Sequence, residues 1–141
     1  MPSKQPNVCA VESVNHVGIV ARDLETAVKL YCDIFGLKPG PVKELLEHGV
    51  KAVMVDVGGV HLEFLQPTRT DSGIGRFLES HGEGLHHVAL QVDDIKGKVE
   101  TLKRRGIELI DQEPRQGLSG IIAFIHPKGM HGTLVELVQP Q

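Results

Sequence analysis

The chain has 141 residues, a formal net charge of −3 and 40% hydrophobic residues, which suits one compact domain or two half-size modules that share a core. Aromatic residues make up only 4% and the basic residues are scattered, so the composition favours neither a nucleic-acid-binding nor a membrane-binding protein. Apolar runs are too short to span a bilayer, and residues 1–13 do not resemble a secretory signal. With only Cys9 and Cys32, both expected as reduced thiols, we expect a cytoplasmic protein.

The first regular element is a strand predicted at residues 14–20, after a loose tail at 1–13. Alternate side chains of a strand point to opposite faces. Val17 and Ile19 are therefore expected to face a covering helix, and His16 to face the other side.

The next elements are a helix and short strands. Asp23 is a good N-cap for a helix over 24–35, which has an apolar i, i+3, i+4, i+7 stripe and ends at Gly36. Strands are predicted at 50–57 and 60–65. Glycine-containing turns are expected to bracket the first of these strands, at Gly40-Pro41 and Gly58-Gly59.

A short helical connector is predicted over residues 68–84. Asp71-Ser72 begins its helix and Gly82 ends it. Its apolar residues need cover, so we interpret this segment as a connector within a single domain (14–141) rather than as a domain boundary.

The second half repeats the first. A strand at 85–92 places His87 on the face opposite the covering helix, and that helix is capped by Asp94 and stops before Gly106. The remaining strands are predicted at 107–111, 121–125 and 133–138, with a glycine-rich loop at 117–120. We expect three short strands after the helix in each half, so each half is β-α-β-β-β, in modules 14–67 and 85–140.

The repeat carries chemistry as well as structure. A His opens each copy and a Glu closes it: His16 and His87 are 71 residues apart, and Glu63 and Glu136 are 73 apart. Two copies of one unit related by a pseudo-twofold axis would bring these four side chains together. Two imidazoles and two carboxylates are typical ligands of a divalent metal.

The metal interpretation also rests on the cost of burying a carboxylate. Glu63 and Glu136 each lie between apolar residues in a strand, where an ionised group needs a partner. Nitrogen and oxygen ligands without thiolate fit Co²⁺, Mn²⁺, Ni²⁺ or Zn²⁺. The alternative is two surface carboxylates and two hydrogen-bonded structural imidazoles.

The other histidines are weaker candidates for functional-site residues. His61 is in phase with Glu63 and is a minor candidate for lining a cavity, whereas His86 points to the opposite face from His87 and is expected to be structural. The sequence contains no nucleophile elbow, phosphate loop or dinucleotide fingerprint. Metal-assisted polarisation of a carbonyl, with a carboxylate as base, is the chemistry that remains.

These features resemble the vicinal oxygen chelate superfamily and, more narrowly, the methylmalonyl-CoA epimerase family from Val14 to Gln139. Single matches are weak, but their order and spacing together are specific. The matching stretches are Asn15-His16-Val17, Glu47-His48-Gly49-Val50, Leu62-Glu63-Phe64-Leu65, Asp71-Ser72, Phe77-Leu78, Gly84-Leu85-His86-His87, Val92-Asp93-Asp94-Ile95, Phe124-Ile125-His126-Pro127-Lys128 and Leu134-Val135-Glu136-Leu137.

The resemblance implies an α+β fold whose two modules form an incomplete barrel around one divalent ion, in a homodimer. It places the metal ligands at His16, Glu63, His87 and Glu136, with Glu136 also acting as the base for the α-proton of an acyl-CoA substrate. The implied activity interconverts (R)- and (S)-methylmalonyl-CoA through an enolate.

Two alternatives stay open, a glyoxalase I-type lactoylglutathione lyase and a non-catalytic metal- or small-molecule-binding member of the superfamily. The chain also departs from the family pattern. Ala52 stands where some epimerases carry a second acid, and Ile121-Ile122 where many carry basic or polar residues. The second acid is therefore unassigned, with Glu47 and His48 as weak candidates.

Overall fold

The computed structural model describes residues 8–141, so most of the tail predicted at 1–13 lies outside the described residues. The chain forms two compact units. We call residues 16–86 the first unit, and residues 8–15 with 87–141 the second unit. No helix among the described residues has the length and apolar character needed to cross a membrane.

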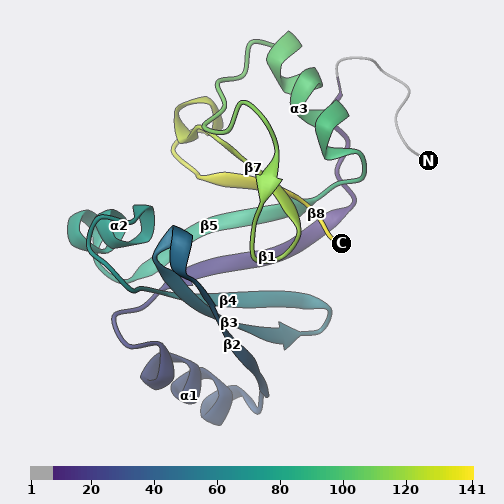
Figure 1. The fold of residues 1–141 in the computed structure, drawn as a ribbon. Coiled ribbons are helices and arrows are strands. Elements are labelled where there is room, and N and C mark those ends of the chain that lie inside the picture. Colours follow the sequence, from purple (N-terminus) through teal and green to yellow (C-terminus); the bar gives the residue numbers. More distant parts are fainter. Residues whose placement is uncertain (1–7) are drawn as a thin grey trace. The chain divides into compact units, whose positions relative to one another are not determined.

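The first unit is a four-stranded sheet covered by a helix (Figure 1). Its sheet has the order β2-β3-β4-β1, with β1 parallel to β4 and the other pairs antiparallel. Helix α1 packs on β3 and β4 around a core that includes Phe64. The elements are β1 (Ser13–Val20), α1 (Leu24–Phe35), β2 (Pro39–Leu45), a 3-10 turn (Leu46–His48), β3 (Val50–Val57), β4 (Val60–Pro67) and α2 (Gly73–His81).

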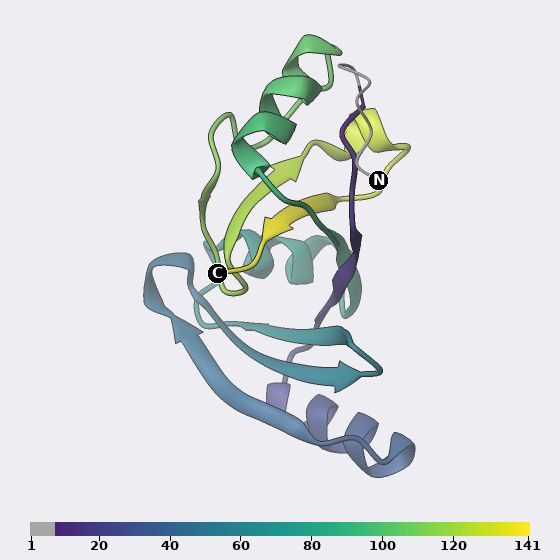
Figure 2. The same ribbon diagram turned by 90° about the vertical axis from the view of Figure 1, so that its right-hand side faces the viewer.

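The second unit repeats this plan with the order β5-β8-β7-β6, in which β5 is parallel to β8. Helix α3 lies beside β7 and β8 (Figure 2) and closes a core that includes Leu137. The elements are β5 (Gly84–Gln91), α3 (Ile95–Arg104), β6 (Arg115–Gln116), β7 (Ile121–Ile125), a 3-10 turn (Pro127–Met130) and β8 (Val135–Gln139).

The two units match in detail. The Gln66 side-chain oxygen accepts a hydrogen bond of 2.8 Å from the Leu24 N–H at the start of α1. The Gln139 side-chain oxygen accepts one of 2.8 Å from the Ile95 N–H at the start of α3. Each glutamine ties the first turn of a helix to the strand that ends its module. The order of the elements in the two units confirms the predicted β-α-β-β-β repeat.

One difference from the sequence-based expectation lies at Gly40-Pro41, which belong to strand β2 rather than to a turn. The register of β2 against β3 shifts between Pro39 and Val42, and β2 is an edge strand of the first unit's sheet, where proline is tolerated. A Cβ on Gly40 would lie 2.8 Å from the Met54 carbonyl oxygen, so glycine permits the close approach of the two strands.

A second difference lies at residues 107–111, which form only an isolated bridge between Leu109 and Ile125. The regular ladder is interrupted because the Asp111 carboxylate accepts the Phe124 N–H at 2.8 Å, in place of a main-chain carbonyl. The regular edge strand of this sheet is instead the short β6, at residues where the sequence predicts no regular element.

Candidate metal centre

The first unit holds one of the two predicted His–Glu pairs. His16 on β1 lies opposite His61 on β4. Glu63 is two residues after His61 on the same strand, so His16 and Glu63 share one face of the sheet. The other face packs on α1 through Ile19 and Phe64, as the alternation predicts. The Nε2 atom of His16 is 3.5 Å from Oε1 of Glu63, and the two residues are 0% and 4% exposed.

The second unit holds the other pair in the same arrangement. Ala89 of β5 lies opposite Glu136 of β8, which puts His87 and Glu136 on one face. Val88 and Leu137 point to the opposite face and pack with α3. The Nε2 atom of His87 is 3.5 Å from Oε1 of Glu136, and both residues are buried.

The geometry of each pair fits a metal site. A separation of 3.5 Å is longer than a normal hydrogen bond. Two ligands about 2.1 Å from one ion at a tetrahedral angle are about 3.4 Å apart. A buried imidazole and a buried carboxylate at this spacing are therefore suited to bind one cation, and each unit supplies one such pair.

The site face of the second unit's sheet is apolar around its His–Glu pair. Phe124 of β7 lies directly opposite Glu136, and its ring makes an edge-to-face contact with His87 at 5.6 Å between centroids. Phe124 also packs on a small cluster formed by Ala89, Ile122 and Val138. Apolar side chains around a carboxylate keep water away from it and strengthen its interaction with charge.

The structure also brings forward a residue that the sequence analysis missed, Arg115. Its guanidinium carbon lies 5.8 Å from the centre of the Phe124 ring, and its Nε atom is 2.9 Å from an Asp111 carboxylate oxygen. Arg115 lies opposite Ile122 on β7, and Lys43 holds the matching place opposite Ala52 in the first unit. That shared register is the signal that the repeat could have supplied.

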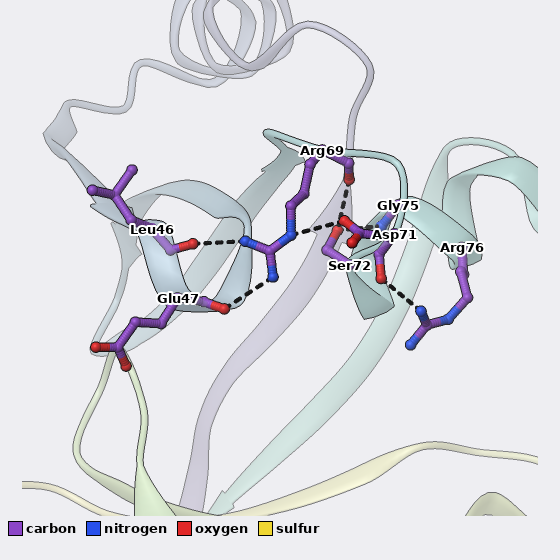
Figure 3. A network of polar contacts seen from close by, with 7 residues as sticks. All are labelled: Leu46, Glu47, Arg69, Asp71, Ser72, Gly75 and Arg76. Atoms are coloured by element: carbon purple, nitrogen blue, oxygen red, sulfur yellow. Dashed lines mark hydrogen bonds and ion pairs between the residues drawn. The ribbon is translucent and has the colours of Figure 1, made fainter.

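Glu47 and His48, the two candidates for the second acid, lie on a turn that Arg69 binds through hydrogen bonds (Figure 3). The Arg69 guanidinium donates to the carbonyl oxygens of Leu46 and Glu47 at 2.8 and 3.0 Å. Its Nε atom is also 2.8 Å from an Asp71 carboxylate oxygen, and Figure 3 shows the Glu47 carboxylate directed away from this network. Arg69 therefore fixes the main chain of the turn while leaving the Glu47 carboxylate outside the network.

Ala52, which stands in place of the second acid of some epimerases, is a buried apolar residue on β3. The minor candidate His61 lies 3.7 Å from the Asp56 carboxylate. His86 makes an edge-to-face contact with Phe77 of α2 at 4.8 Å, in keeping with the structural role expected for it.

Comparison with known proteins identifies the family of the chain. Residues 15–124 match the glyoxalase/bleomycin resistance protein/dioxygenase superfamily. The chain belongs to this superfamily. It is 40% identical to the mitochondrial methylmalonyl-CoA epimerase of Mus musculus, over 89% of this chain and 72% of that protein. It is 35% identical to the ethylmalonyl-CoA/methylmalonyl-CoA epimerase of Cereibacter sphaeroides, over 89% of this chain and 96% of that protein.

A solved structure gives the same result. The chain resembles a methylmalonyl-CoA epimerase in complex with methylmalonyl-CoA and NH4+, with a TM-score of 0.88, 34% identity, and coverage of 93% of this chain and 96% of that one. These similarities confirm the predicted resemblance to the methylmalonyl-CoA epimerase family and the predicted α+β fold class.

Proposed function

We propose that this protein interconverts the (R) and (S) forms of methylmalonyl-CoA. The observation that carries the proposal is similarity to named epimerases over nearly the whole chain, one of them solved with methylmalonyl-CoA. The matched buried His–Glu pairs supply suitable chemistry. These relatives favour an epimerase over a lactoylglutathione lyase or a non-catalytic binding protein.

The proposed metal site uses both pairs. In it, His16 and Glu63 of the first unit and His87 and Glu136 of the second bind one divalent ion. Two neutral imidazoles and two carboxylates balance a divalent charge, which compensates for burying both carboxylates. The donor set fits Co²⁺, Mn²⁺, Ni²⁺ or Zn²⁺, and elemental analysis of the purified protein identifies which ion it holds.

The proposed reaction removes and returns the α-proton of the acyl group. A bound divalent ion would polarise the thioester carbonyl and stabilise negative charge on its oxygen. Glu136 would accept the proton on a carboxylate oxygen, in a position that is 4% exposed and flanked by Val135 and Leu137. Burial of this kind limits exchange of the abstracted proton with water.

Inversion also requires a proton donor on the other face, or rotation of the enolate past a single base. Ala52 cannot donate a proton. Glu47 and His48 are the remaining candidates, on the turn that Arg69 holds.

The proposal is tested with single-enantiomer methylmalonyl-CoA in deuterated water. An epimerase places deuterium at the α-carbon and forms the opposite enantiomer, and this should stop when a chelator removes the metal. Isomerisation of a thiol hemithioacetal without α-deuteration of methylmalonyl-CoA would instead identify a lactoylglutathione lyase. Binding of metal without either reaction would identify a non-catalytic member.

A homodimer and a cytoplasmic location complete the proposal. Exposed apolar side chains on α1, at Leu30, Ile34 and Phe35, are consistent with a surface that a second subunit covers. Sedimentation equilibrium should give twice the 15.4 kDa mass of the chain, and fractionation of the source cells should place the protein in the cytoplasm.

A further inference from the structure

We propose that Arg115 is a substrate-binding residue that recognises an anionic oxygen group of the acyl-CoA. This group is either the carboxylate of the acyl moiety or a phosphate of the coenzyme. The inference rests on the proposed function and deepens it, because it assigns a specificity-determining residue outside the four proposed metal ligands.

The first argument is the position of Arg115 in the sheet. Directly opposed residues of antiparallel strands project to the same face. Arg115 is opposite Ile122, which is two residues from Phe124, and Phe124 is opposite Glu136. Arg115 therefore lies on the face that carries the His87–Glu136 pair, and its guanidinium packs on the ring that contacts His87.

The second argument concerns the donors of the guanidinium. Its Nε atom is engaged by Asp111. Among residues 8–141, neither of its Nη nitrogens makes a hydrogen bond or ion pair. The side chain is 42% exposed, so a ligand can reach these nitrogens. Two Nη groups in a rigid plane can bind two oxygens of one carboxylate or phosphate.

The third argument is that the side chain is already ordered. One oxygen of the Asp111 carboxylate contacts Nε of Arg115 at 2.9 Å and the other accepts the Phe124 N–H at 2.8 Å. The Phe124 ring supports the guanidinium from a second direction. Arg115 is thus linked to β7 by two contacts, which reduces the side-chain entropy that binding would cost.

A purely structural role for Arg115 would not use its two Nη groups. The ion pair with Asp111 uses only one edge of the guanidinium, so it does not account for the two accessible Nη groups. A cation that is fixed beside a reactive site and keeps two donors accessible is suited to bind an anionic ligand.

The test measures the binding of methylmalonyl-CoA to the parent protein and to Arg115→Gln and Arg115→Lys by calorimetry, together with KM and kcat for epimerisation. We expect Arg115→Gln to raise Kd and KM about 10- to 100-fold, and to change kcat much less. Arg115→Lys keeps the charge and loses the two-pronged geometry, so it should give a smaller rise. The charge-matched control is Lys29→Gln, an exposed lysine on α1 paired with Asp33, which should bind like the parent.

Two further ligands identify the group that is recognised. The methylmalonyl thioester of pantetheine lacks the coenzyme's nucleotide phosphates, and propionyl-CoA lacks the carboxylate. If Arg115 binds the carboxylate, the defect of Arg115→Gln persists with the pantetheine thioester and disappears with propionyl-CoA. If Arg115 binds a phosphate, the pattern is reversed.

Parental Kd and KM in both Arg115 variants would overturn the inference. Failure of the parent protein to epimerise would instead overturn the proposed function, and the calorimetric comparison would still decide whether Arg115 binds the ligand. Should Arg115→Gln fail to fold, the smaller change in Arg115→Lys supports or overturns the inference by the same measurements.

Discussion

The two units share one plan, and their differences are confined to particular parts of it. Both place a buried His and a buried Glu at 3.5 Å on one face of a four-stranded sheet, and both tie a glutamine to the first turn of the covering helix. Opposite the glutamate, however, the first unit has Met54 and the second has Phe124.

The edge strands differ further. The edge strand β2 has seven residues and β6 has two. The matching cation is Lys43 in the first unit and, in the second, Arg115 stacked on an aromatic ring. The matched parts include the His–Glu pair that each unit would contribute to the proposed metal site. The parts that differ are those that an asymmetric substrate would contact once.

The largest expected effect tests whether the two histidines are equivalent. His16→Ala and His87→Ala should each remove bound metal and lower α-proton exchange by at least about 100-fold, because each leaves a buried carboxylate without its neighbouring ligand. Elemental analysis and deuterium exchange measure both effects. His61→Ala is the matched control on the same sheet face and should keep the metal. Full metal content in either of the first two variants would show that one pair suffices.

The second prediction separates the two glutamates. Glu136→Gln should slow exchange of at least one enantiomer about 10²- to 10⁴-fold, since an amide cannot act as the base, while metal stays bound through the other three ligands. Glu63→Gln keeps a side-chain oxygen that can bind the ion, so exchange should fall far less. Equal losses would mean that the two carboxylates share one role, and parental exchange in Glu136→Gln would place the base elsewhere.

The third prediction compares the two cores. Phe64 and Leu137 occupy matching places in β4 and β8 and are almost fully buried. Phe64 also contacts the Tyr31 ring at 4.9 Å. Phe64→Ala should lower the free energy of unfolding by about 3–5 kcal/mol and Leu137→Ala by about 2–5 kcal/mol. Urea denaturation measures both, and a change near zero in either would contradict the assigned packing.

The smallest effects concern the helix caps. Asp23 and Asp94 both accept a hydrogen bond in the first turn of a helix, but Asp94 has a φ of 42° and Asp23 has −127°. Asp94→Ala should therefore be the more destabilising of the two alanine variants, by about 1 kcal/mol of left-handed strain. Asp94→Gly should recover that difference, and thermal unfolding compares the three. Equal loss in the alanine variants would remove the strain argument.

The Asp23 cap also predicts a pH dependence. Hydrogen bonds from Thr26 lower the pKa of the Asp23 carboxyl. A folded-state pKa below the unfolded value means that the stabilisation is present at neutral pH and is lost as the pH falls through the lowered pKa. Asp23→Asn should flatten this part of the stability–pH curve relative to the parent, and an unchanged curve would contradict it.

Much of the fold was predictable because helices and paired repeats leave local signals. Helix α1 has the predicted cap and terminating glycine, and its bounds agree with those predicted. Its apolar stripe is buried at Leu24 and Val28 but exposed at Ile34 and Phe35. The repeat predicted each His–Glu pair, since matched strands put the same residue types on the same face. That the two pairs share one ion stays a prediction.

The sheet edges were harder to predict. The strand containing Gly40-Pro41 depends on a register shift against β3, and the interruption at 107–111 depends on where the Asp111 carboxylate points. Neither is encoded in the local residue pattern. Arg115 was missed because its relation to Glu136 passes through two strand registers, and its match with Lys43 in the repeat is the one signal that the sequence holds for it.

The division of the chain has a consequence for its synthesis. Residues 8–15 belong to the second unit, where the Glu12 N–H donates to the Gln91 carbonyl at 2.8 Å and Cys9 packs on the core beneath α3. On the ribosome, the segment 16–86 emerges complete, while the residues before it must wait for their partners. The entropic cost of closing a loop grows only with the logarithm of the loop's length, so the separation of residues 8–15 from the rest of their unit costs little stability. We expect it to slow folding instead.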